Sequence, residues 1–273
     1  MKSWNIPACT LAAVAALAAL APATSRAETP DEWRFNATIY GWLPDMGGST
    51  KFPEGSGGSS VEVTASDILN ALDFAFMGTL GAQKGRWGIF TDVNYLNLSD
   101  SAKRTRDLTV GNVALPVGVT AKADLGITGW LWTTVGSYRV VDKPDYAMDL
   151  VAGVRLLNLA EDLKWNLTGD LGDLPIIDRK GKSHVSDNYW DGIVGVKGRA
   201  TFGAEKKWFV PYYVDIGTGD SDLTWLGMLG AGYSFDWGDV VGVWRYVDYE
   251  FSSKDPIQDL YFNGPAIGVT FHF

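Results

Sequence analysis

Apolar and polar residues alternate with a period of two along most of the chain. In residues 267–273 every second residue is apolar, ending with Phe271 and Phe273, and the residues between them, including His272, are small or polar. A strand with this pattern places one face in an apolar medium and the other face in a polar interior. The pattern therefore predicts β-strands with two different environments.

The alternation predicts about ten antiparallel strands, with twelve as an alternative. Tight turns alternate with longer connections, of which 44–72, 99–120 and 158–187 are the longest. Short periplasmic turns and long external loops are typical of membrane barrels. We therefore predict an all-β fold, an antiparallel transmembrane β-barrel with both termini periplasmic. The predicted strands are Trp33–Leu43, Asp73–Lys84, Arg86–Leu98, Ala121–Val141, Asp145–Leu157, Asn188–Phe202, Lys207–Gly217, Leu223–Phe235, Asp239–Phe251 and Gln258–Phe273.

Charged residues mark the inner face, because a charge at the lipid midplane costs about 2–4 kcal/mol. Ten strands enclose a lumen little wider than its own side chains. Opposed charges there are expected to pair and close the barrel; a narrow polar path or a binding or catalytic cleft are the alternatives. For Arg155 the expected cross-strand partners are Asp191 or Asp92. The predicted lumen charge network is Arg34, Asp92, Asp149, Arg155, Asp191, Lys197, Arg199, Asp215 and Arg245.

The strand at 239–251 has a less clear pattern. An inward Arg245 sends Trp244 and Tyr246 to the lipid, but it sends Asp248 with them. Asp248 must then lie at the outer interface, or a bulge must shift the register.

The first long connection has its own signals. Residues 51–60 are rich in Gly and Ser, and 66–72 offers a capping residue, Ser66, followed by apolar residues at helical spacing. We expect a short helix here. It either packs against loop aromatics or covers the mouth of the barrel.

The N-terminus resembles a secretory leader. Lys2 precedes an apolar run at 11–21 that is too short to span a bilayer, and Ser25-Arg26-Ala27 fits the small-x-small cleavage rule. We predict a signal peptide at 1–27 and a mature barrel with long extracellular loops at 28–273. Cys9 is the one cysteine of the chain, so the mature protein has no thiol.

Composition narrows the class of protein. The chain has 23 basic and 32 acidic residues, and removing Lys2 and Arg26 leaves 21 against 32, a net charge of −11. This balance argues against nucleic-acid binding, which needs a basic face. The 12 Trp residues suit the aromatic girdles of a barrel. No mature segment has 18 consecutive apolar residues, which excludes a transmembrane helix.

Several phrases stand out along the sequence, namely Tyr40–Pro44, Asp67–Leu69 with Leu72–Phe74, Lys84–Gly88, Pro211–Ser221 and Trp244–Tyr249. Together they resemble a group of proteobacterial outer-membrane β-barrel proteins, most of them of uncharacterised function. The resemblance spans nearly all of the mature chain and implies the fold and the bacterial outer membrane. It also implies membrane lipid, periplasmic chaperones and the barrel assembly machinery as partners, with Phe271 and Phe273 as the assembly signal. It carries no activity.

Few residues of the sequence are candidates for catalysis or metal binding. His184 lies near Asp178, Ser186 and Asp187 in an expected external loop, and an Asp/His pair can activate water or a serine. Solvation of an exposed histidine is the simpler explanation, and His272 is expected to be a rim residue. We predict no metal site, no cofactor and no catalytic residue.

The sequence thus predicts a monomeric outer-membrane barrel with a structural or surface role, and at most a narrow pore for small solutes or ions. The alternatives are a hydrolase with its site on the external rim and a ligand-binding or adhesive surface protein.

Overall fold

The computed structural model of the chain describes residues 32–50, 59–104, 109–110, 113–114, 119–169, 177–252 and 257–273. The predicted leader with Cys9 lies outside the described residues, as does most of the Gly/Ser-rich stretch. Within the described ranges, no helix has the length and apolar character needed to cross a membrane.

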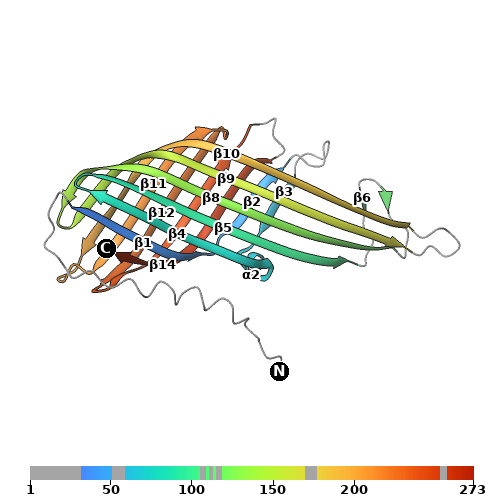
Figure 1. Cartoon of the computed structure of the whole chain (residues 1–273), viewed down its shortest axis with the longest axis horizontal. Coiled ribbons are helices and arrows are strands. Elements are labelled where there is room, and N and C mark those ends of the chain that lie inside the picture. Colours follow the sequence, from blue (N-terminus) through green and yellow to red (C-terminus); the bar gives the residue numbers. More distant parts are fainter. Residues whose placement is uncertain are drawn as a thin grey trace, which may run out of the picture.

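Ten antiparallel strands form a closed barrel (Figure 1), which confirms the predicted fold class. Each strand pairs with the next along the chain, and β1 pairs with β14 to close the cylinder. Every predicted strand is present. The barrel strands are β1 (Trp33–Trp42), β4 (Leu72–Lys84), β5 (Trp87–Arg104), β8 (Val119–Lys143), β9 (Tyr146–Gly169), β10 (Ile177–Phe202), β11 (Trp208–Gly219), β12 (Leu223–Phe235), β13 (Gly238–Glu250) and β14 (Ile257–His272).

Four short connections lie at one end of the barrel, which we call the turn end. They follow β4, β8, β10 and β12, as the tight turns of the sequence predict. Gly85 has a φ of 57°, the left-handed conformation that glycine adopts most easily in a tight turn. β1 begins and β14 ends at this same end, because Asn36 pairs with His272. We call the opposite end the loop end.

At the loop end β1 continues into β2 (Asp45–Thr50) along the same partner strand. Trp42 pairs with Ala266 and Asp45 with Asn263, so both strands keep one register against β14. Pro44 interrupts the ladder between them because it has no N–H to donate. β2 then pairs with β3 (Ser59–Val63) as a hairpin above the barrel. A separate small pair is formed by β6 (Thr109–Val110) and β7 (Val113–Ala114).

The expected helix of the first long connection is present as α2 (Ala65–Ala71) at the loop end. Its N-cap is Thr64, two residues before the capping residue that the sequence suggested. Thr64 and Asp67 form a reciprocal capping box, which satisfies backbone donors at the start of the helix. α2 buries Ile68 and contacts β5.

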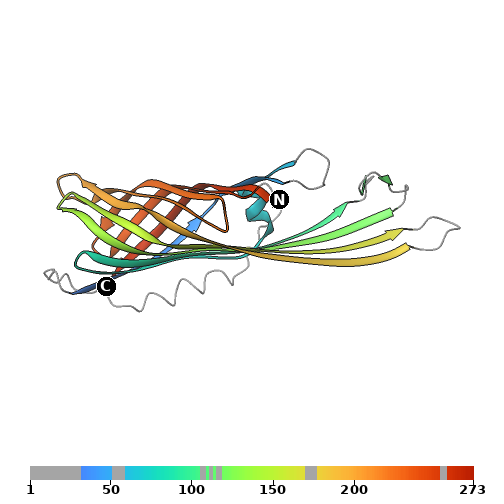
Figure 2. The same ribbon diagram turned by 90° about the horizontal axis from the view of Figure 1, so that it is seen from above.

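Three strands are much longer than the others. β8, β9 and β10 contain 25, 24 and 26 residues, and with β5 they leave the barrel as a four-stranded sheet (Figure 2). The prediction of loops over 99–120 and 158–187 was therefore largely wrong. The strands continue to Arg104 in β5, to Gly169 in β9 and back from Ile177 in β10.

The outer surface carries two aromatic belts separated by aliphatic side chains. In β12, Trp225 belongs to the loop-end belt and Phe235 to the turn-end belt, with the exposed Leu229 between them. Ten residues of strand rise about 34 Å, which a tilt of about 40° reduces to about 26 Å. A transmembrane barrel needs an apolar band about 25 Å tall. The exterior is therefore that of a membrane-spanning barrel.

The register of β13 decides between an interface position for Asp248 and a bulge in the strand. Its pairing with β12 and β14 is continuous, so no bulge intervenes and Asp248 faces outward. It lies two residues from the loop end of the strand and accepts a hydrogen bond from Tyr246 at 2.7 Å. Tyr246 in turn stacks on Trp225 and Tyr261 of the aromatic belt. Asp248 thus lies at interface height, as the first of the two sequence alternatives requires.

Candidate functional site in the barrel interior

The interior contains buried charges of both signs, as the alternation of the strands predicts. Seven of the nine predicted network residues form ion pairs in the interior, and an eighth, Asp191, is held by hydrogen bonds. Arg34 lies exposed at the turn end of β1. The buried charged residues are Asp92, Asp149, Arg155, Asp191, Asp215, Asp239 and Arg245.

Arg155 of β9 is the centre of the loop-end half. Its side chain is 0% exposed and forms an ion pair with Asp215 of β11, which is equally buried. The same guanidinium donates to the hydroxyls of Thr133 at 3.3 Å and Thr224 at 3.2 Å. Gly195 lies beside Asp215, where a Cβ would come within 2.8 Å of the Asp215 Cβ. Because Gly195 has no side chain, it leaves room for the Arg155–Asp215 pair.

The predicted partners of Arg155 were wrong. Asp191 instead accepts hydrogen bonds from the backbone N–H of Ser221 at 3.0 Å and from its hydroxyl at 2.8 Å. Asp92 pairs with Arg245 at 3.0 Å. Sequence patterning places these side chains on the inner face, but it does not give the height and stagger that decide which ones meet.

Arg245 and Asp92 belong to a second cluster near the middle of the barrel. The Tyr40 hydroxyl donates to Asp92 at 2.6 Å, and Arg245 donates to the Tyr40 oxygen at 2.9 Å. Asp92 also accepts from Thr79 at 2.8 Å. The Arg245 guanidinium lies over the ring of Trp42, 4.7 Å from its centroid. This cluster therefore ties β1, β4, β5 and β13 together.

The charges of the turn-end half lie closer to solvent. Arg139 of β8 pairs with Asp149 at 2.5 Å, and Lys197 of β10 lies 3.8 Å from the same carboxylate. Arg199 pairs with Asp239 at 2.6 Å, and His272 contacts Asp239 at 3.2 Å with 55% of its side chain exposed. His272 is a rim residue, as expected from the sequence.

The charged and tyrosine side chains of Tyr40, Arg139 and Asp239 in these clusters were not predicted from the sequence, and neither was the buried Tyr249. Arg139 shares its parity with the inward Ser137 and Thr133, and Asp239 shares that of Arg245, so strand phase alone could have found both. Tyr40 and Tyr249 carry no charge. In a barrel, an inward tyrosine is distinguished from a girdle tyrosine only by the phase of its strand.

Apolar side chains fill the loop-end half around the Arg155 pair. Tyr249 and Val247 of β13, Val135 of β8 and Leu157 of β9 are at most 1% exposed. Water reaches side chains that face an open channel, and it does not reach these. The cluster is completed by Trp42, Met77, Leu131, Val151, Ile193, Tyr213, Leu226, Phe251, Phe262 and Ala266.

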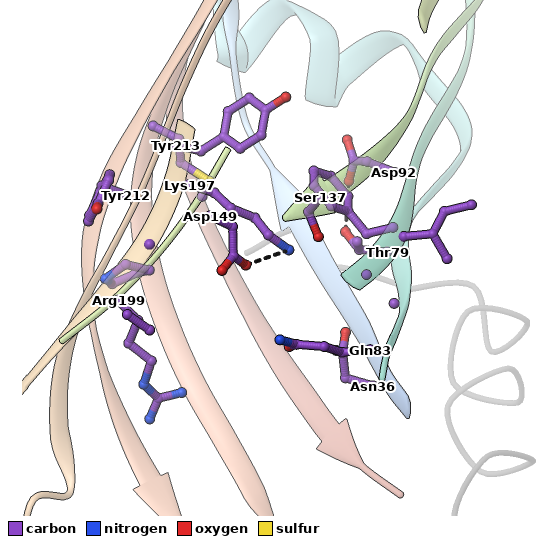
Figure 3. A pocket seen from close by; sticks show the side chains of 18 of the residues that line it. Asn36, Thr79, Gln83, Asp92, Ser137, Asp149, Lys197, Arg199, Tyr212 and Tyr213 are labelled. Carbon is purple, nitrogen blue, oxygen red and sulfur yellow. Dashed lines mark hydrogen bonds and ion pairs between the residues drawn. The ribbon is translucent and has the colours of Figure 1, made fainter. Parts of the chain in front are cut away.

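The turn-end half instead encloses a cavity of about 380 Å³. Four cations line it, Arg139, Lys197, Arg199 and Arg245, against the two carboxylates of Asp92 and Asp149. In Figure 3, Lys197 and Asp149 lie together on one wall, and the amides of Gln83 and Asn36 face them. Phe90, Tyr213, Leu226 and Met228 supply apolar lining. The volume lies near the lower limit of small-molecule pockets, about 300–1,000 Å³.

The remaining residues singled out from the sequence lie elsewhere. His184 lies in β10 opposite Asp162, not in a loop, and its side chain lies outside the described part of the structure. Phe273 exchanges backbone hydrogen bonds with Phe35 at 2.9 and 3.1 Å, so it completes the β1–β14 seam. The ring of Phe271 contacts that of Trp237 in the turn-end belt. Their role in assembly stays a prediction.

Comparison with known proteins adds little to this description. No family model and no curated protein matches the chain. Among solved structures, the chain is similar to the outer-membrane protease OmpT from Escherichia coli, with 11% identity, a TM-score of 0.46, and 91% of this chain and 99% of that chain covered. It is also similar to the translocator domain of the autotransporter NalP from Neisseria meningitidis, with 14% identity, a TM-score of 0.41, and coverage of 91% and 90%. These likenesses carry no argument about activity.

Proposed function

We propose that the protein is a closed, monomeric barrel of the bacterial outer membrane with a structural or surface role. It anchors the four-stranded sheet of β5, β8, β9 and β10 outside the cell. The proposal assigns the turn end to the periplasm, where short turns of such barrels lie. Its partners are then membrane lipid and, during biogenesis, periplasmic chaperones and the barrel assembly machinery.

The observation that carries the proposal is the layer of buried side chains at the height of Arg155. Arg155, Asp215, Thr224, Tyr249 and Val135 come from five different strands and are all buried. An ion crossing this layer would have to break the Arg155–Asp215 pair or enter apolar packing, and both are costly. The interior charges bind one another, which supports a structural role over a catalytic one.

Conductance in a planar lipid bilayer tests closure directly. We expect no discrete current steps from the purified protein in 1 M KCl, while a general porin in the same membrane gives them. Steps that scale with protein concentration would refute closure and would favour the narrow-pore alternative.

Labelling of single cysteines tests the orientation. If the leader with Cys9 is removed, S186C in β10 and E205C in the β10–β11 turn each provide the one thiol of the mature protein. Both native side chains are exposed. A membrane-impermeant maleimide should label S186C on intact cells and E205C only after the outer membrane is permeabilised. The reverse pattern would place the extended sheet in the periplasm.

A further inference from the structure

We propose that the turn-end cavity is a binding site for a small organic carboxylate with an aromatic or aliphatic body. This inference goes beyond the closed-barrel proposal and is tested separately. The site is a dead-end pocket beneath the packed layer of Arg155, and its ligand enters between the short turns.

The Lys197 ammonium is loosely paired, which leaves it available to an anionic ligand. Its ion-pair partner is Asp149, at 3.8 Å, beyond hydrogen-bond distance. Asp149 is already bound by Arg139 at 2.5 Å, so two cations share one carboxylate. The Lys197 side chain is 31% exposed although it points into the barrel, and its nitrogen is directed into the cavity (Figure 3). An ammonium has three donors, and a ligand anion can take them.

The three other cations of the lining are held more firmly. Arg245 is bound by Asp92 and Tyr40. Arg199 is bound by Asp239 at 2.6 Å and by Ser234 at 2.7 Å. Arg139 also donates to Gln83 at 3.2 Å. Lys197 is therefore the group that an incoming anion meets with the smallest loss of existing contacts.

An apolar surface of the cavity lies beside the Lys197 ammonium. The Lys197 nitrogen lies 4.5 Å from the centroid of the Phe90 ring, and Phe90 meets Tyr213 edge to face at 5.9 Å. Leu226 and Met228 continue this wall. A bare inorganic anion leaves the wall unused, whereas a carboxylate with an apolar body covers it while its head group reaches Lys197.

Two small polar side chains lie on the opposite wall of the cavity. Ser137 and Asn36 line the cavity with a hydroxyl and an amide that can donate to a second carboxylate oxygen. Gly88 allows Ser137 its position, because a Cβ on Gly88 would lie 2.6 Å from the Ser137 hydroxyl. In small-molecule sites, polar groups placed in this way fix the orientation of the ligand.

Isothermal titration calorimetry on the folded full-length protein in detergent tests the proposal with benzoate as the probe. We expect one benzoate per chain at pH 7. Benzamide, which has the same shape without the charge, and inorganic phosphate, which has charge without an apolar body, should each bind at least about tenfold more weakly. Absence of benzoate binding would overturn the proposal. Phosphate binding as tight as that of benzoate would overturn the assignment of an apolar body.

Two substitutions with opposite expected signs locate the site. K197M should weaken benzoate binding about tenfold or more, the loss of one charge-assisted hydrogen bond. D149N should tighten binding, because it removes the carboxylate that competes for Lys197. K207M is the matched control: it removes an ammonium at the same end of the barrel, paired with Glu205 outside the cavity, and should leave binding unchanged.

Heat-dependent migration on a denaturing gel confirms that each variant is folded, and K197Q replaces K197M if the latter is not. Equal benzoate affinity of the wild type and the folded Lys197 variant would overturn the proposal. A conducting barrel that still binds benzoate would refute closure alone, and a closed barrel that does not bind it would refute the carboxylate site alone.

Discussion

The two halves of the lumen contain the same kinds of residue but arrange them differently. In the loop-end half, Arg155 and Asp215 form an ion pair that is sealed among apolar side chains. In the turn-end half, Arg139 and Lys197 share Asp149 on the wall of a cavity. The comparison teaches that burial and the ratio of cations to carboxylates decide whether an interior ion pair closes a barrel or leaves a charge available.

The largest expected effect is the loss of Arg155. R155M leaves the Asp215 carboxylate buried without its cation, which should lower the free energy of unfolding by about 3–5 kcal/mol. The double variant R155M/D215N should recover part of this loss. Urea unfolding of the folded protein in lipid vesicles provides the measurement. If the losses of R155M and of D215N alone add up to that of the double variant, Arg155 and Asp215 are not coupled.

Truncation of the apolar layer should be the next largest effect. L157A removes a side chain that is 1% exposed and should lower the unfolding free energy by about 2–5 kcal/mol. M228A, on the cavity wall, should cost less because its surroundings are already open. The same urea titration compares them. Equal losses would mean that the two halves are packed alike.

A smaller effect is expected for the charges at the turn end. R199M removes a partner of Asp239, but the Arg199 side chain is 35% exposed and His272 still contacts Asp239. The expected loss is about 1 kcal/mol or less, reduced further by added salt. A loss as large as that of R155M would contradict the distinction between the halves.

The smallest effect concerns the capping box of α2, outside the barrel. Hydrogen bonds from Thr64 hold the pKa of Asp67 below its ordinary value. Because the folded pKa is the lower one, the stabilisation is fully present above the ordinary pKa and is lost as the pH falls through the folded one. T64V should raise the pKa of Asp67, as measured by carboxyl NMR titration. S66A is the control, since the Ser66 hydroxyl bonds to that of Thr64 at 2.8 Å and not to the Asp67 carboxylate.

The sequence allowed prediction of the ten strands and the inward face, because a two-residue period follows directly from strand geometry. It also contained a signal for the extension that the loop prediction missed. Leu157, Leu159, Leu163, Trp165 and Leu167 repeat with a period of two into the predicted loop, on the odd-numbered positions that carry Asp149 and Arg155 in the barrel. The charged residues within 158–187 concealed that period.

Pairing within the lumen could be predicted far less well. Asp191 directly opposes Arg155 in the β9–β10 register, yet Arg155 pairs with Asp215 on the strand beyond. Which side chains meet depends on barrel stagger and on small residues such as Gly195, which open space locally. The cavity is equally a property of packing, and no single motif of the sequence encodes it.

The seam between β1 and β14 sets the order of events during folding. The hydroxyls of Thr38 and Thr270 meet across it at 2.8 Å, although 232 positions separate them along the chain. Contacts of such high sequence separation form late, because the loop between them must be ordered first. Until β14 has been synthesised, β1 keeps an unpaired edge that is prone to aggregation. The barrel therefore closes only once β14 is available, and its first strand depends on its last.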